Sequence, residues 1–113
     1  MNRLSRGDIW LAELGAGRGR EQAGTRPFLV VSDSRFSSGP AELVIGVPLT
    51  TTDRRIVSHV PVATPEGGVR RGSFIMCEQV RSVSRERMLK RLGRVENKTM
   101  RAVEDIIRVL LNT

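Results

Sequence analysis

The stretch Glu42–Thr51, ELVIGVPLTT, decides the fold of this 113-residue chain. It is apolar almost throughout, which predicts a strand buried on both faces in the middle of a sheet. On both sides of it, apolar segments bounded by turn residues indicate further strands. These are Gly7–Leu14, Phe28–Asp33, Ser58–Ala63, Ser73–Val83 with a bulge near Gln79, and Arg91–Val95. Several short strands at regular spacing favour a mainly β fold built as a small barrel.

The hydrophobic pattern changes period at the C-terminus. From Asn97 onward the apolar positions fall on one face of a helix, with Asn97 as the expected N-cap. They are Met100, Val103, Ile106, Ile107, Leu110 and Leu111. Such a face needs a packing partner, either the barrel or a second copy of the chain. The absence of repeats and linkers predicts one domain spanning residues 1–113.

Composition bounds the classes of protein to consider. The 39% hydrophobic and 27% charged residues are typical of a globular domain, and a chain of this size can bury a core without disulfides. Apolar runs of only a few residues exclude a membrane-spanning helix, and the charges in Met1–Trp10 argue against a secretory signal. Cys77 and His59 are the only residues of their types, which argues against a disulfide or a Cys/His metal centre. We therefore expect a cytoplasmic protein without a cofactor.

The charge points to a polyanionic partner without establishing one. Nineteen basic against twelve acidic residues give a net charge of +7, and seventeen of the basic residues are Arg. Arg grips phosphate in a bidentate way. A nucleic-acid-binding surface and a merely basic, soluble surface are equally compatible with this excess. Because the basic residues are dispersed along the chain, any phosphate-binding surface must be assembled by folding.

The glycine-rich loop Gly15–Thr25, GAGRGREQAGT, is the first candidate site. No Gly-Lys-Ser/Thr follows it, so it is not a P-loop, and a strand rather than a helix comes next, unlike a dinucleotide fingerprint. The loop and its end offer Arg18, Arg20, Glu21, Gln22 and Arg26. Arg can clamp a phosphate and Gln can read base edges, although a mobile surface loop is an equal alternative. Arg26 is pinned by Pro27 where the loop meets the strand.

Three further groups carry polar chemistry. The hydroxyls of Thr50–Thr52 could donate to a phosphate, although threonines are common at strand ends. Glu78, Gln79 and Arg81 place a carboxylate, an amide and a cation near the end of the long strand, and strict alternation would put Glu78 on the face opposite the other two. Cys77 reads as a buried small hydrophobe and His59 as a structural strand residue rather than a general base.

These residues together resemble a known family. The blocks are Arg6-Gly7-Asp8-Ile9-Trp10, Gly19-x-Glu21-Gln22-x-Gly24-x-Arg26-Pro27, Leu29-Val30-Val31-Ser32, Val47-Pro48-Leu49-Thr50 and Cys77-Glu78-Gln79-Val80-Arg81-Ser82-Val83. In order and spacing they resemble the MazF/PemK toxins of bacterial toxin–antitoxin systems. The resemblance implies an SH3-like small β-barrel (MazF/Kid/CcdB-like) with a C-terminal helix. It also implies a homodimer that cuts single-stranded RNA at specific sequences without a metal. The implied partner is an antitoxin whose acidic, disordered tail occupies the RNA groove.

The resemblance also assigns roles to particular residues. It places catalysis on Arg26 and Thr50, with attack of the ribose 2′-hydroxyl on the adjacent phosphorus. It implies RNA binding by Arg20, Glu21, Gln22, Ser73, Glu78, Gln79 and Arg81. The acceptor of the 2′-hydroxyl proton stays open, with Glu21 and Glu78 as candidates. Arg20 stands where many chromosomal relatives carry Ser, which is expected to change RNA contacts rather than the reaction.

Two departures and two alternatives bear on this assignment. Some plasmid-borne relatives use a His, an Arg and an Asp at the positions held here by Arg20, Met76 and Glu78, and Met76 cannot donate a proton. This favours Arg26 with Thr50. Relatives with the same barrel poison DNA gyrase by binding it, but that branch lacks the Gly-x-Glu-Gln-x-Gly-x-Arg-Pro loop. An inactive nucleic-acid-binding module is the other alternative, and the presence of both Arg26 and Thr50 argues against it.

Overall fold

The computed structural model describes residues 3–19 and 21–113, and within them β-strands predominate. The strands are β1 (Asp8–Glu13), β2 (Thr25–Val30), β3 (Leu43–Thr50), β4 (His59–Val62), β5 (Ser73–Met76), β6 (Arg81–Ser84) and β7 (Met88–Arg94). The helices are α1 (Ser34–Ser37) and α2 (Asn97–Leu111), with 3₁₀ turns η1 (Glu66–Gly68), η2 (Cys77–Gln79) and η3 (Arg85–Arg87). The expected strand-rich chain with a C-terminal helix is confirmed.

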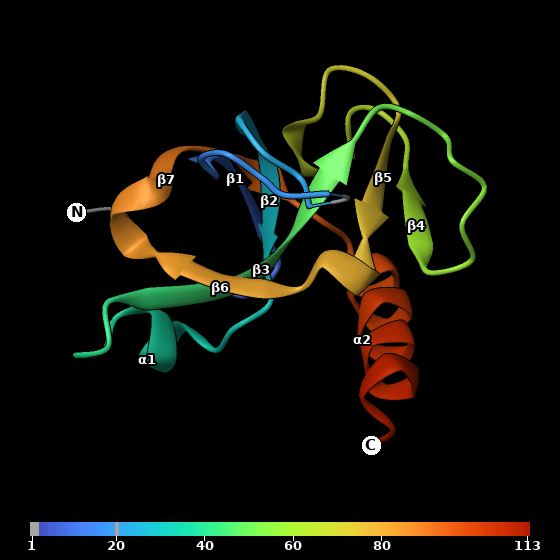
Figure 1. Ribbon diagram of the computed structural model, residues 1–113. Coiled ribbons are helices and arrows are strands. Elements are labelled where there is room, and N and C mark those ends of the chain that lie inside the picture. Colours follow the sequence, from blue (N-terminus) through green and yellow to red (C-terminus); the bar gives the residue numbers. More distant parts are fainter. Residues whose placement is uncertain (1–2, 20) are drawn as a thin grey trace.

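Strand β3 is the hub of the sheet, as its apolar sequence predicts. It pairs antiparallel with β2, β5 and β6. The strand order is β4-β5-β3-β2-β1-β7, with β6 joined to β3 beside this path. In the described residues no strand pairing joins β4 to β7, so the seven-stranded sheet is curled but not closed (Figure 1). The fold is therefore a small, β-barrel-like sheet with its ends left open.

The long strand expected over Ser73–Val83 is two strands. Residues 49 and 46 of β3 lie opposite Ile75 and Arg81, so three steps along β3 correspond to six along the partner segment. The 3₁₀ turn η2 takes up the difference. The interruption near Gln79 is thus larger than the expected bulge, and strict alternation does not hold across Glu78, Gln79 and Arg81. Because β5 and β6 pair with different halves of β3, the sheet bends at this point.

Apolar residues fill both faces of β3. On one face Leu29, Val47 and Leu49 pack with Met100 and Val103 of α2. On the other face Phe28 and Val44 belong to a second cluster that contains Trp10 and Val83. The packing around Gly46 leaves no room for a side chain at that position, because a Cβ there would lie 2.3 Å from the Phe28 ring. Burial on both faces is what the sequence of this strand predicts.

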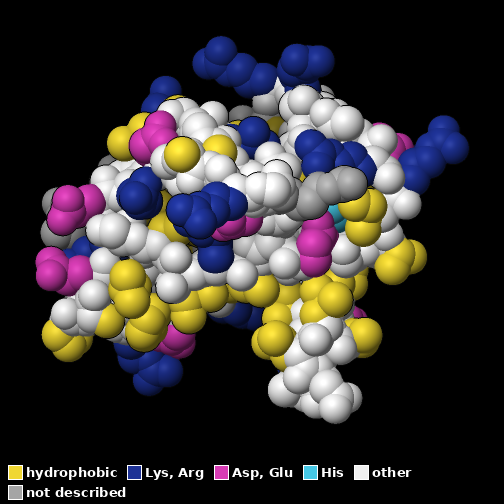
Figure 2. Space-filling model, in the orientation of Figure 1, with side chains coloured by type: hydrophobic (Ala, Val, Ile, Leu, Met, Phe, Trp, Pro, Cys, Tyr) yellow, Lys and Arg dark blue, Asp and Glu magenta, His cyan; other side chains and the backbone are white. Residues whose placement is uncertain are grey.

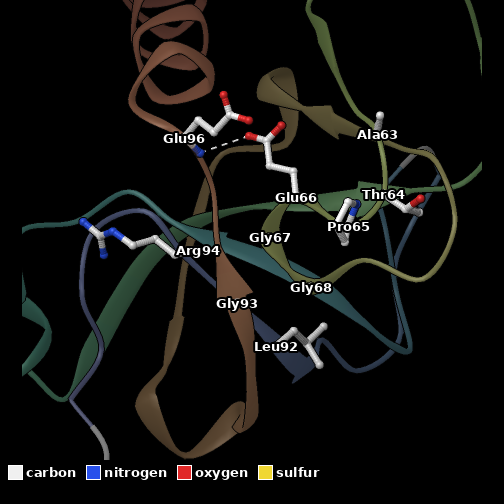
Figure 3. A pocket seen from close by; sticks show the side chains of 10 residues that line it. All are labelled: Ala63, Thr64, Pro65, Glu66, Gly67, Gly68, Leu92, Gly93, Arg94 and Glu96. Carbon is white, nitrogen blue, oxygen red and sulfur yellow. Dashed lines mark hydrogen bonds between the residues drawn. The ribbon is translucent and has the colours of Figure 1, made fainter.

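Helix α2 begins where expected, but its N-terminus is capped from elsewhere. Asn97 is the first helical residue, and the cap residue is Glu96, whose side chain makes no capping hydrogen bond. The carboxylate of Glu66 in η1 instead accepts from the backbone N–H of Glu96 at 3.0 Å (Figure 3). It also accepts from the Thr99 hydroxyl at 2.5 Å. The expected Asn97 cap is therefore wrong, because a tertiary contact supplies the acceptor.

Other boundaries differ from the sequence-based expectation by a few residues. Strand β2 begins at Thr25 and ends at Val30, and β7 begins already at Met88. The segment between β2 and β3 contains the short helix α1, whose N-cap Asp33 accepts from the backbone N–H of Arg35 at 2.8 Å. Among residues 3–19 and 21–113, no helix has the length and apolar character needed to cross a bilayer.

Candidate functional site

A cavity of about 340 Å³ lies where the ends of β2, β3 and β5 meet. Strand register brings these ends together: Phe28 pairs with Pro48, so continuing the ladder places Arg26 opposite Thr50. Thr50 pairs in turn with Phe74, the residue after Ser73. The lining residues are Gln22, Arg26, Pro27, Leu49, Thr50, Thr51, Thr52, Arg54 and Ser73. Gln22, Arg26, Thr50 and Ser73, to which the resemblance assigns roles, thus share one cavity.

The guanidinium of Arg26 is fixed by main-chain carbonyls. Its Nε donates to the Ala23 carbonyl at 3.0 Å and its Nη1 to the Leu49 carbonyl at 3.1 Å. Burial, and after it the charge of Arg54, lowers the pKa of Arg26 from its ordinary value. Two of the five N–H groups are accounted for by these bonds, so the others can bind an anion in the cavity.

The polar side chains around Arg26 are also oriented. The Thr50 oxygen accepts from the backbone N–H of Thr52 at 3.2 Å, which leaves the Thr50 hydroxyl hydrogen available to donate. The Ser73 hydroxyl donates to the Arg71 carbonyl at 2.8 Å, which leaves its oxygen available to accept. Gln22 is buried at the inner end of the glycine-rich loop. The cavity therefore offers a fixed cation and a fixed hydroxyl donor.

The two carboxylates considered as proton acceptors do not line this cavity. Glu21 is exposed, and its carboxylate accepts from the backbone N–H of Arg18 at 3.2 Å. Glu78 lies beyond the opposite end of β5 from Ser73. Asp and Glu are absent from the described residues that line the cavity. What this arrangement supplies is positive charge and hydrogen-bond donors, not a side-chain carboxylate base.

Of the remaining nominated residues, Gln79 ends η2 and Arg81 starts β6, away from the cavity lining. Arg20 lies outside the described residues. The structure therefore groups Gln22 and Ser73 with Arg26 and Thr50, but does not bring Glu21, Glu78, Gln79 and Arg81 to them within one chain.

Glu78 belongs to a separate polar cluster with Ser58 and His59. The Ser58 hydroxyl donates to Glu78 Oε1 at 2.5 Å, and His59 Nε2 lies 2.7 Å from Glu78 Oε2. Burial raises the pKa of Glu78, but the hydrogen bonds from Ser58 and His59 outweigh it and hold that pKa below its ordinary value. The His59 side chain is 3% exposed, consistent with the structural role expected for it at the start of β4.

Cys77 is buried, as the sequence predicts. Burial first, and the neighbouring Glu78 charge second, raise the pKa of its thiol to about 12. A thiol with that pKa stays protonated at neutral pH and is a poor nucleophile.

Arg54 is the lining residue that sequence reasoning missed. The run Asp53–Arg55 reads as a charged turn, and nothing in its spacing separates Arg54 from Arg55. The structure does so, because Arg54 lines the cavity while Arg55 is absent from its lining. Only the path of the loop between β3 and β4 makes this distinction.

Two other cavities lie nearby. One of about 610 Å³ is bordered by η1 and the end of β7, where Figure 3 shows Glu66 and Arg94 on opposite sides of Gly93. The other, of about 410 Å³, has an apolar floor that includes Leu11 and Leu92 and is edged by Arg70, Arg71 and Lys90. It shares Pro27, Thr51 and Ser73 with the Arg26 cavity.

Figure 2 shows Lys and Arg side chains projecting from the upper edge of the molecule, over the loops on either side of β4. Hydrophobic side chains gather along the lower edge and on α2. Folding thus places basic side chains near the end of the sheet that holds the cavity, although they are dispersed in the sequence.

Comparison with known proteins identifies the family of this chain. Residues 5–111 match the family of PemK-like, MazF-like toxins of type II toxin–antitoxin systems, and the chain belongs to that family. It is 28% identical to the endoribonuclease EndoA of Bacillus subtilis (strain 168), over 96% of this chain and 94% of EndoA. It is also 28% identical to the endoribonuclease MazF of Staphylococcus saprophyticus, over 96% of this chain and 91% of that protein.

Solved structures show the same fold. A crystal structure of MazF from Deinococcus radiodurans matches with a TM-score of 0.88 at 21% identity, covering 100% of both chains. A MazE–MazF complex from the same organism matches with a TM-score of 0.84 at 22% identity, covering 100% of this chain and 99% of that one. The expected MazF-like fold is therefore confirmed.

Proposed function

We propose that this MazF-type endoribonuclease toxin cleaves single-stranded RNA at the cavity that holds Arg26 and Thr50, without a metal ion. One observation carries the proposal: a guanidinium held by two main-chain carbonyls and a hydroxyl free to donate line the same cavity. Fixed donors of this kind suit a reaction whose transition state gains negative charge on phosphoryl oxygens.

The reaction proposed is a transesterification within the RNA strand. The ribose 2′-oxygen forms a bond to the adjacent phosphorus, and the bond from phosphorus to the 5′-oxygen breaks. One proton leaves the 2′-hydroxyl and one joins the departing 5′-oxygen. The products are a 2′,3′-cyclic phosphate and a 5′-hydroxyl. Arg26 holds the phosphoryl oxygens in a bidentate way and Thr50 donates a further hydrogen bond.

Proton transfer is the part of the reaction that the cavity side chains support least. No carboxylate or imidazole belongs to the described lining residues. An Arg side chain keeps its proton in proteins, so Arg26 is not assigned as a base. We therefore assign the cavity an electrostatic role, in which charge stabilisation supplies most of the rate enhancement.

The partners proposed are the RNA, a cognate antitoxin and a second copy of the chain, all in the cytoplasm. Solved neighbours include MazE–MazF complexes and an endoribonuclease from a mycobacterial species with its cognate antitoxin. The +7 charge suits both RNA and an acidic antitoxin tail. For the homodimer, α2 projects from the sheet and carries exposed Val109, Leu110 and Leu111 near its end (Figure 1).

The test is RNA cleavage in EDTA by the purified protein, with the new ends mapped by sequencing. We expect cuts at one short motif that leave 5′-hydroxyl ends. Arg26→Ala should lower the cleavage rate by at least about 10²-fold. Arg35→Ala, which removes an exposed Arg of α1 away from the cavity, should leave the rate unchanged. Intact RNA with folded wild-type protein, or wild-type cutting by folded Arg26→Ala, would refute the proposal.

A further inference from the structure

Arg54 is a second cation in the Arg26 cavity, and it lacks the anchoring that Arg26 has. It comes from the loop between β3 and β4 and lines the cavity with Arg26 and Thr50. It is exposed, and within the described part of the chain it makes neither a hydrogen bond nor an ion pair. Arg26, by contrast, is tied to the carbonyls of Ala23 and Leu49.

The two guanidinium groups face one cavity without a counter-ion from the described lining. The carboxylate nearest in sequence, Asp53, accepts from the backbone N–H of Arg55 at 2.9 Å, within its own turn. Asp and Glu do not occur among the described lining residues. Two like charges that share a partly buried cavity repel each other, and an anion bound between them removes that cost. The arrangement is thus suited to bind an anion.

Phosphoryl chemistry fits this pair better than a carboxylate ligand does. A phosphodiester presents two non-bridging oxygens and carries one negative charge, and the pentacoordinate transition state gains a second. Two guanidinium groups can both donate hydrogen bonds to these oxygens, each of which can accept more than one. The second cation therefore stabilises the transition state, which carries the greater negative charge, more than the bound substrate. An interaction of this kind raises kcat rather than only tightening binding.

We propose that Arg26 and Arg54 together bind the scissile phosphoryl group, with Arg26 as the prearranged cation and Arg54 as a second catalytic residue ordered by the substrate. This rests on the proposed ribonuclease function and adds a residue to it. Arg54 donates to the same phosphoryl oxygens as Arg26 and Thr50 and brings a second positive charge to them. The loop between β3 and β4 thereby becomes part of the catalytic site rather than only of the RNA-binding surface.

Arg55 provides a matched control, because it neighbours Arg54 in the same loop and carries the same charge. It is also exposed, but it does not line the cavity. Its backbone adopts a positive φ of 53°. Replacing either Arg by Gln removes one positive charge from the loop. Only the change at Arg54 should remove a donor from the cavity.

The experiment measures single-turnover cleavage of one single-stranded RNA in EDTA for wild type, Arg54→Gln, Arg54→Lys and Arg55→Gln. We expect Arg54→Gln to lower the rate at saturating enzyme by about 10- to 100-fold, and Arg54→Lys to recover part of it. Arg55→Gln should stay within about twofold of wild type. Equal rates for Arg54→Gln and Arg55→Gln, or a loss in Arg54→Gln that disappears at saturating enzyme, would overturn the proposal.

A second measurement separates this proposal from the ribonuclease function itself. Inorganic phosphate serves as the probe, and its binding is followed by ³¹P NMR titration of each variant. Arg54→Gln should weaken phosphate binding by at least about fivefold relative to Arg55→Gln. If wild-type protein leaves RNA intact, the ribonuclease function fails, and this titration still decides whether the two arginines share an anion. Equal phosphate affinity for Arg54→Gln and Arg55→Gln would overturn the two-arginine site.

Discussion

Replacing Thr50 by Val separates catalysis from stability at the cavity. Val keeps the branched shape of Thr but lacks the hydroxyl. Within the described part of the chain, that hydroxyl makes one hydrogen bond: its oxygen accepts from the backbone N–H of Thr52 at 3.2 Å. Thr52 is exposed, so water can take over as its acceptor. We therefore expect Thr50→Val to cost less than about 1 kcal/mol of unfolding free energy, a fall in Tm of at most about 8 °C.

The expected effect on catalysis is several times larger. The Thr50 hydroxyl hydrogen is available to donate, and we place it on a phosphoryl oxygen in the transition state. Loss of one such donor costs about 2.7 to 4 kcal/mol, or about 10²- to 10³-fold in kcat. Thr50→Ser restores the donor and loses only a methyl group, so its rate should lie within about tenfold of wild type.

The assay pairs two measurements on each variant: single-turnover RNA cleavage in EDTA at saturating enzyme, and thermal unfolding followed by circular dichroism. A folded Thr50→Val protein that cuts within threefold of the wild-type rate would show that the hydroxyl takes no part in the reaction. A loss for Thr50→Ser as large as that for Thr50→Val would show that the hydroxyl alone does not account for the effect, and would refute the hydrogen-bond argument.

Two further predictions concern stability. The pKa of Glu78 is lowered in the fold, so its stabilising effect is present above its ordinary value of 4.5 and is lost as the pH falls through the lowered value. Denaturant titrations at pH 7 and at pH 3 to 4 should show Glu78→Gln less stable than wild type at pH 7, with the gap narrowing in acid; a constant gap would contradict this. Gly46→Ala should lower stability by about 1 to 3 kcal/mol or more, because its Cβ would lie 2.3 Å from the Phe28 ring and 2.4 Å from the Leu29 carbonyl. Thermal unfolding checks it, and an unchanged Tm would contradict the close packing.

The strands and α2 could be predicted because their signals are local. The apolar run of β3 and the helical spacing from Met100 to Leu111 each identify one element without reference to the rest of the chain. The division of the segment Ser73–Val83 into two strands could be predicted only in part from the sequence. Gln79 indicates an irregularity, but the three additional residues opposite β3 follow from how β5 and β6 pair with that strand. Strand pairing depends on tertiary contacts that a local pattern does not encode.

The N-terminus of α2 is a second case in which a tertiary contact could not be predicted from the local sequence. Asn97 is a good cap by residue type, yet the carboxylate that accepts the backbone N–H of Glu96 belongs to Glu66, thirty residues earlier. A sequence-based prediction of the helix start assumes that a side chain next to the helix accepts its first N–H groups. Where another segment supplies that acceptor, the cap residue can be of any type. In η1, Glu66 itself carries no sequence signal for this role. Contacts between distant segments, rather than propensities, determine which of two plausible residues is used.

The cavity depends both on a local sequence motif and on tertiary contacts. For this reason the sequence identifies its two cations, Arg26 and Arg54, unequally well. Arg26 is recognisable from its motif, and its geometry depends on the carbonyls of Ala23 and Leu49, which any residue at those positions would supply. Arg54 depends on the course of a loop instead. Its place in the cavity follows only from the folded path of that loop after β3. Comparing the cleavage rates of Arg54→Gln and Arg55→Gln measures how much the loop contributes to catalysis.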